Sequence, residues 1–207
     1  GYFGWQWWQG NERSQAEAAS NVYQGFVEAV TANEGQPDNK QMTTAQSLAR
    51  ELKDDYAGRI YAAQASLQLA GLAAQKNDLE TAAKELQWVL ENSDDEALKL
   101  VAKRRLASVK AARGETKEAL ELVQGDVPPA FAALYAETRG DILAKQGDKE
   151  GARAAYQQAR AQLLPEQAAG SRLLDLKIEN LGEAPQAESD NTQDEPADEA
   201  ETEKDAQ

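Results

Sequence analysis

One helix-turn-helix pattern occurs three times in this chain, and this repetition limits the fold more than any other feature of the sequence. The segments "KNDLETAAKEL" (76–86), "RGETKEALEL" (113–122) and "QGDKEGARAAY" (146–156) each contain a Gly or Asn turn, an acidic residue and then a helical pattern. A small residue follows each turn by five positions, and the three pairs are Asn77 and Ala82, Gly114 and Ala119, and Gly147 and Ala152. The turns are therefore 37 and 33 positions apart. A period near 34 residues is typical of stacked helical hairpins, each of which buries its apolar face against its neighbours.

The apolar spacing outside the repeats is also helical, and no alternating strand pattern is found. Before the repeats it predicts helices over residues 14–32, 41–52 and 56–75. Within "SDDE", Ser93 and Glu96 are expected to form a capping box that begins a helix ending near Arg113.

Proline and glycine residues predict where the remaining helices begin and end. Pro128 and Pro129 suit a first helical turn, and the helix before them, after Gly114, has barely two turns. Pro165 is expected to begin the last helix, which Gly182 ends. We therefore predict an all-α helical-hairpin solenoid of about nine helices over residues 11–182.

The composition changes at residue 183. Residues 183–207 contain ten acidic side chains, one basic side chain (Lys204) and no large apolar side chain. Burial cannot offset the entropy of ordering such a segment, so we predict a disordered acidic tail. A solvated tail is the simplest interpretation. The alternatives are that it repels anionic lipid, tunes solubility or docks on a basic partner.

The first ten residues, "GYFGWQWWQG", are aromatic in an otherwise polar and acidic chain. They are too short to cross a bilayer but are typical of one end of a spanning helix. The expected residues of the interfacial aromatic belt are Tyr2, Phe3, Trp5, Trp7 and Trp8. The alternative is that these rings pack on the domain. Residues 11–39 have Arg13 as their one basic residue, and this places the domain on the side away from the cytoplasm.

The residue types needed for most catalysis are missing. The chain has no Cys and no His, which excludes disulfides, the usual zinc sites, the commonest general base and thiol nucleophiles. Adjacent carboxylates occur at 54–55 and 94–95, where capping of helix ends is expected instead of catalysis. We therefore expect no enzymatic activity, no cofactor and no metal. The net charge of −14 argues against nucleic-acid binding.

Protein binding remains, because a stack of helical hairpins forms a concave face lined by the first helix of each pair. The residues that the repeat register places there are Gln64, Gln68, Arg104, Ser108, Glu137, Asp141 and Lys145. The basic run "KRR" (103–105) is interpreted as a solvated helix face, with a binding patch as the alternative. Trp88 is interpreted as a core residue, with a ligand-facing ring as the alternative.

A family resemblance rests on these motifs. "RGDILAKQGDKEGARAAYQQA" (139–159) is similar to a tetratricopeptide repeat, and its signature positions are Gly140, Gly147, Ala152, Tyr156 and Ala159. The order of segments resembles the YfgM-like ancillary subunits of the bacterial Sec translocon. The matching pieces are Gly4, Trp5 and Trp8, then "VYQGFVEAV" (22–30), "YAAQASLQLA" (61–70), "NDLETAAKELQWVL" (77–90), "DEALKLVAKRRLASV" (95–109), "GDKEGARAAYQ" (147–157) and "LKIENL" (176–181).

The resemblance implies a Gram-negative inner-membrane protein with a short cytoplasmic segment, one membrane helix and a periplasmic repeat domain. Such proteins associate with the Sec channel and with a membrane-anchored chaperone resembling a prolyl isomerase, and are thought to help newly exported chains. The family has no catalytic motif. The acidic tail and Lys110, where an apolar residue is usual, depart from its pattern. Two alternatives stay open: a scaffold for cell-wall or outer-membrane assembly, and an enzyme using paired carboxylates.

Overall fold

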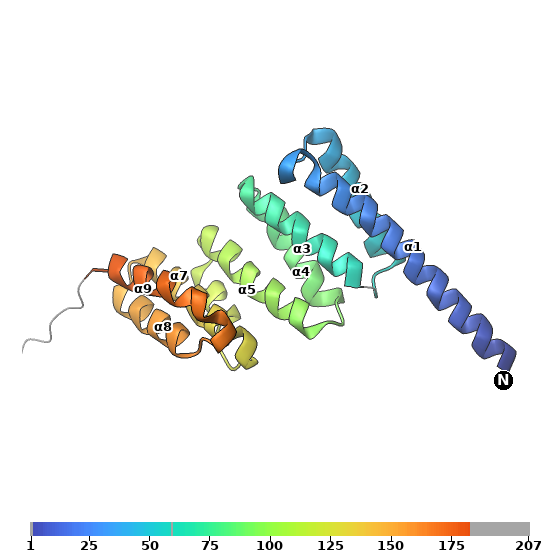
Figure 1. Cartoon of the computed structure of the whole chain (residues 1–207). Coiled ribbons are helices and arrows are strands. Elements are labelled where there is room, and N and C mark those ends of the chain that lie inside the picture. Colours follow the sequence, from blue (N-terminus) through green and yellow to red (C-terminus); the bar gives the residue numbers. More distant parts are fainter. Residues whose placement is uncertain (1, 59, 183–207) are drawn as a thin grey trace, which may run out of the picture.

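Nine α-helices and one short 3-10 helix make up the part of the chain that the computed structural model describes, residues 2–58 and 60–182 (Figure 1). Side chains are described from residue 12 onward within these ranges. The helices are α1 (Tyr2–Gly35), α2 (Asn39–Asp55), α3 (Ile60–Gln75), α4 (Leu79–Asn92), α5 (Glu96–Ala112), α6 (Thr116–Leu122), α7 (Pro129–Gln146), α8 (Lys149–Ala161), the 3-10 helix η1 (Pro165–Gly170) and α9 (Ser171–Asn180). These residues contain no strand, so the predicted all-α class is confirmed. The predicted acidic tail, residues 183–207, lies outside the described residues.

Consecutive helices form antiparallel hairpins that stack along the molecule (Figure 1). The hairpins are α1–α2, α3–α4, α5–α6 and α7–α8, and α9 packs on the last of them. Asn77, Gly114 and Gly147 lie at the turns inside three hairpins, with φ angles of 58°, 85° and 84°. This left-handed backbone ends one helix and lets the next one turn back. The predicted turn positions are therefore confirmed.

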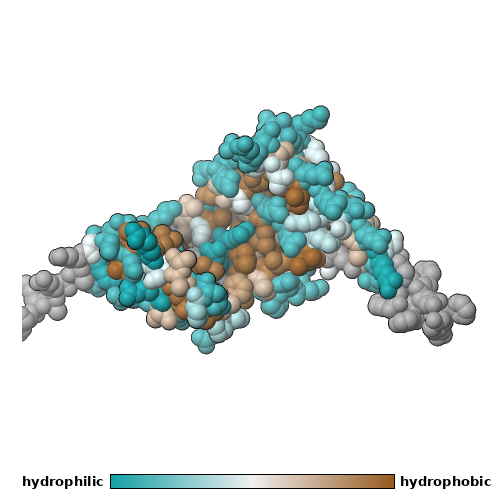
Figure 2. Space-filling model, in the orientation of Figure 1, coloured by the Kyte–Doolittle hydropathy of each residue, from teal (hydrophilic) through white to brown (hydrophobic). Residues whose placement is uncertain are grey.

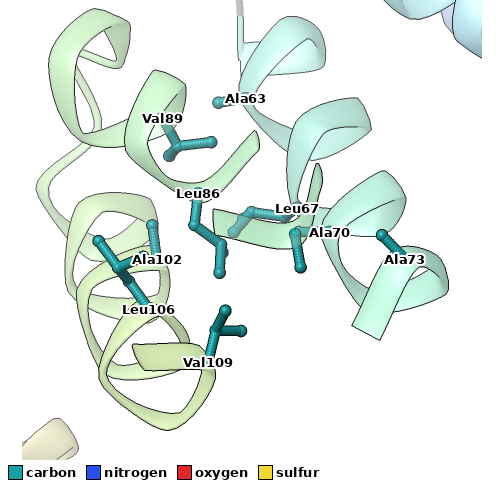
Figure 3. Packing of buried hydrophobic residues seen from close by; sticks show 10 residues of the cluster. Ala63, Leu67, Ala70, Ala73, Leu86, Val89, Ala102, Leu106 and Val109 are labelled. Carbon is teal, nitrogen blue, oxygen red and sulfur yellow. The ribbon is translucent and has the colours of Figure 1, made fainter. Parts of the chain in front are cut away.

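Small residues allow the paired helices to approach closely. Ala82, Ala119 and Ala152, the three repeat alanines, are each 0% exposed. Around the first of them, larger side chains from α3, α4 and α5 point toward one another, as Figure 3 shows for Leu67, Leu86 and Leu106 among others. Removing this apolar surface from water stabilises the stack by roughly 25 cal/mol per Å².

Trp88 joins two core clusters. Its partly buried ring packs against the α3–α5 cluster and also against the cluster that α1, α2 and α3 form. The Nζ atom of Lys53 lies 5.2 Å from the centroid of the ring and forms an ion pair with Glu85. Trp88 therefore contributes to the packing of the first hairpin against the second, in agreement with its interpretation as a core residue.

Two predicted helix starts in the middle of the chain are wrong. The helix expected from residue 56 begins at Ile60, because α2 continues to Asp55 and the N–H of Tyr56 donates to the carbonyl of Leu52. The predicted capping box is also wrong, because the carboxylate of Asp95 caps α5 by accepting from the N–H of Leu98 at 2.9 Å.

The two ends of the domain differ from prediction as well. Helix α1 begins at Tyr2, not near residue 14, so the aromatic stretch belongs to the same helix. Its regular part ends where predicted, because Asn33 and Glu34 have left-handed φ angles. Pro165 begins the 3-10 helix, and the α-helix starts only at Ser171.

Candidate protein-binding face

The first helices of the hairpins place polar side chains on one shared face. Residues separated by three or four positions lie on the same side of a helix, and two arginines of α5 reach across to α3 and α7. We call this surface the first-helix face. It consists of Tyr61, Gln64 and Gln68 from α3, Val101, Arg104, Arg105 and Ser108 from α5, and Leu134, Glu137, Thr138, Asp141 and Lys145 from α7. The space-filling view shows apolar surface gathered over the middle of the molecule, with polar surface on both sides (Figure 2).

The α3 part of the face is fixed to α1 by an aromatic group. The ring of Tyr23 stacks on Tyr61 at 5.0 Å and on Phe26 at 6.0 Å between centroids. Its hydroxyl accepts a hydrogen bond from Nε2 of Gln68 at 3.0 Å. Burial raises the pKa of Tyr23, and the hydrogen bond with Gln68 partly offsets this effect. Gln68 is therefore half-buried and hydrogen-bonded to α1. Gln64, one turn earlier on α3, is also half-buried.

The α5 part carries two neighbouring arginines. Arg104 donates from Nη1 to the hydroxyl of Thr138 at 3.4 Å, and Arg105 donates from Nη1 to the carbonyl of Leu67 at 3.4 Å. Burial lowers the pKa of Arg105, and the charge of Arg104 lowers it further. Ser108 is exposed one turn later. The sequence prediction contained Arg104 but missed Arg105, although the run "KRR" was the available signal.

The α7 part is occupied by α9. Nζ of Lys177 lies 2.7 Å from Oε1 of Glu137 and 2.7 Å from Oδ1 of Asp141. The hydroxyl of Tyr156 donates to the same Asp141 oxygen at 2.8 Å, and Lys177 lies 5.5 Å from the centre of its ring. Burial lowers the pKa of Lys177, but the hydrogen bonds to Asp141 and Glu137 outweigh this effect, and the pKa is raised.

This arrangement separates the predicted binding residues into two groups. Glu137 and Asp141 hold the last helix in place, and Gln68 is tied to α1. The side chains left to meet a partner are Gln64, Arg104, Ser108 and Lys145. Nothing in the sequence spacing pointed to Lys177, which reaches back 36 and 40 positions to its two carboxylates.

The predicted membrane-interface residues lie within α1, but their side chains are outside the described ones. None of the described helices is long and apolar enough to cross a membrane. Among the described residues, no group of three or more carboxylates could hold a metal ion. The adjacent carboxylates of α2, Asp54 and Asp55, are exposed at its C-terminal end, and Asp95 is a helix cap.

The stacked hairpins, the buried repeat alanines and the polar first-helix face define a tetratricopeptide-type protein. In agreement, residues 1–183 match the family described as "Tetratricopeptide repeat-like domain". The chain is 37% identical to the "Ancillary SecYEG translocon subunit" of Escherichia coli (strain K12), over 86% of this chain and 81% of that protein. Proteins of the same name from Neisseria gonorrhoeae and Haemophilus influenzae are each 30% identical, over 87% and 77% of this chain and 83% and 74% of their own lengths. The chain therefore belongs to the family of ancillary SecYEG translocon subunits. No solved structure matches it significantly.

Proposed function

We propose that this chain is an adaptor of the Sec translocon that binds exported polypeptides on its first-helix face and performs no catalysis. The observation that carries the proposal is its similarity, over most of its length, to proteins named ancillary SecYEG translocon subunits. The stacked hairpins support it, because such stacks offer an extended surface to a second polypeptide.

The proposal divides the chain into three parts. Residues 1–10 form one end of a single inner-membrane helix, residues 11–182 form a periplasmic repeat domain, and residues 183–207 form an acidic tail. The aromatic residues near the start support the anchor, since Trp and Tyr concentrate at membrane interfaces. The acidic flank over residues 11–39 supports the periplasmic side.

The chemistry of the face suits an extended polypeptide. Side-chain amides, guanidinium groups and a hydroxyl lie on the same face as apolar residues such as the half-buried Val101 and the exposed Leu134. These groups can donate hydrogen bonds to backbone carbonyls, which every unfolded chain presents whatever its sequence. Such binding would be broad and reversible, as help for a newly exported chain requires. A membrane-anchored chaperone resembling a prolyl isomerase is the second partner that we propose.

Site-specific photo-crosslinking in inner membranes tests the proposal. The photoreactive residue is placed at Ser108 or Gln64 on the first-helix face, and at Lys117 on α6 as a control, which is exposed on the second helix of its hairpin. We expect adducts with translocon subunits or exported chains from the first two positions and not from the third. Equal adducts from all three positions would contradict a role for this face. Adducts with cell-wall or outer-membrane machinery alone would favour the scaffold alternative.

A further inference from the structure

Arg104 and Arg105 lie in the middle of the first-helix face without a carboxylate partner among the described residues. Three half-buried cations of these repeats have carboxylate partners: Lys53 with Glu85, Lys110 with Glu115, and Lys177 with Glu137 and Asp141. Two half-buried arginines of the last hairpin, Arg139 and Arg153, instead donate to carbonyl and amide oxygens. Each guanidinium group carries five N–H donors, and each of the two arginines uses one of them in a long hydrogen bond of 3.4 Å. Most of their donors are therefore available to an anion.

The two side chains diverge from α5 and span the face. Arg104 reaches Thr138 on α7, and Arg105 reaches Leu67 on α3. Two positive charges on neighbouring residues disfavour each other, and partial burial adds to that cost for Arg105. An anion between or across them would relieve both effects. Carboxylates fit, because guanidinium groups bind them through two parallel N–H bonds.

The chain itself supplies a carboxylate-rich segment. Of the net charge of −14, residues 183–207 contribute −9, and the sequence "DEPADEAETE" (194–203) has six acidic residues and no basic one. The segment has no large apolar side chain, so packing against the domain would contribute little to holding it. Electrostatic attraction is the interaction that its composition supports.

The position of α9 brings this segment within reach. Helix α9 is joined to α7 by Lys177, and α7 is joined to α5 by the hydrogen bond from Arg104. The helix contacts run from α5 to α7, from α7 to α8 and from α8 to α9, and packed helices lie 8–10 Å apart, so the axes of α9 and α5 lie within about 30 Å of each other. From Gly182 to Asp194 the chain has twelve residues, which span up to about 40 Å when extended.

We propose that the acidic segment 194–203 binds in cis to Arg104 and Arg105 and covers the middle of the first-helix face. Tethering raises the effective concentration of such a segment to about millimolar, so a weak contact is still populated. The contact is screened by salt, because its ions remain near water. One consequence rests on the function proposed above: the tail would compete with exported polypeptides for this face.

Paramagnetic NMR on the full chain tests the contact directly. The chain has no cysteine, so A200C carries the only thiol for a nitroxide label. With the label in its oxidised, paramagnetic form, we expect the amide signals of residues 101–108 and 134–141 to lose intensity. The signals of residues 39–46 at the start of α2, a helix that does not pack on α5, should lose much less. The loss should disappear in R104Q/R105Q and at high salt. It should persist in K117Q/K149Q, which removes the same charge from two exposed lysines elsewhere.

Two results would overturn the proposal. One is broadening of α5 and α7 that R104Q/R105Q leaves unchanged. The other is signal loss that arises only between molecules. It would be seen when nitroxide-labelled protein is mixed with isotope-enriched protein that carries no nitroxide. Because R104Q/R105Q could disturb the face, E195Q/E199Q/E201Q/E203Q provides a second variant that changes only the tail and should also abolish the loss. This measurement involves no translocon, so the cis contact and the proposed function can fail separately.

Discussion

A Cβ atom added to Gly140 would lie 2.5 Å from two ring carbons of Tyr156, closer than any real side chain approaches. The tyrosine cannot retreat, because its ring is 3% exposed and its hydroxyl donates to Asp141. Glycine at this position is therefore what allows α7 and α8 to cross so closely.

We predict that G140A destabilises the domain by about 1–3 kcal/mol, since the added methyl group overpacks a filled site. Urea unfolding followed by circular dichroism measures the change. The matched control is G71A in α3, where a Cβ would meet nothing within 4 Å. Alanine is the better helix former there, and we expect a gain of about 0.5–1 kcal/mol. A loss of similar size in both variants would contradict the explanation from the tyrosine contact.

Gly140 and Tyr156 also illustrate which features of the fold could be predicted from the sequence. Gly140 and Tyr156 lie at fixed positions of a repeat, so their helices, their turn at Gly147 and the buried Ala152 follow from local pattern alone. The start of α5 was harder, because Ser93 and Asp95 are both good caps and lie two residues apart. Whether Ser93 or Asp95 occupies the N-cap position depends on how α4 and α5 pack. The local sequence pattern does not specify that packing.

The proposed binding face could be predicted from the sequence only in outline. Helical spacing placed Arg104, Glu137 and Asp141 on one face, and the structure has all three on it. Helical spacing could not show that Lys177 forms ion pairs with Glu137 and Asp141, because this contact depends on how α9 is placed relative to α7. The partner of a long side chain is the group that lies close to it in the folded protein. The separation of the two residues along the sequence does not predict this proximity.

The cap of α5 leads to a second prediction. Asp95 accepts a hydrogen bond from the N–H of Leu98, so D95A leaves that donor without its partner and should cost about 1 kcal/mol. D94A is the matched control, because Asp94 is exposed and next to the cap. Thermal and urea unfolding of both variants measure the difference. If D94A costs as much as D95A, the assignment of the cap is wrong.

Lys177 leads to a third prediction. K177M leaves Glu137 and Asp141 without their cation, and we expect a loss of about 1–2 kcal/mol, moderated because Asp141 is half exposed and screened by water. The effect should be local, since this lysine joins α9 only to the neighbouring helices α7 and α8. Hydrogen exchange should accelerate in α9 more than in α3 or α4. K149M, at an exposed position of α8, should leave the exchange of α9 unchanged.

Tyr135 makes the domain sensitive to alkaline pH. Its hydroxyl donates to the carbonyl of Leu100 at 2.8 Å, its side chain is 2% exposed, and burial raises its pKa to about 12. In the unfolded chain a tyrosine loses its proton near pH 10. The folded state therefore keeps a proton that the unfolded state releases. This contribution is complete below about pH 10 and is lost as the pH rises toward 12.

We predict that Y135F is less stable than the wild type at about pH 8, by about 1 kcal/mol, because its ring cannot donate to Leu100. Between about pH 8 and about pH 11 its stability should decline less steeply, because one titrating group is absent. Tyr23 and Tyr156, whose pKa values burial also raises, contribute equally in both proteins. Urea unfolding across this range measures the two slopes. Parallel slopes would mean that Tyr135 ionises in the folded domain as readily as in water, and that its burial between α5 and α7 is not maintained.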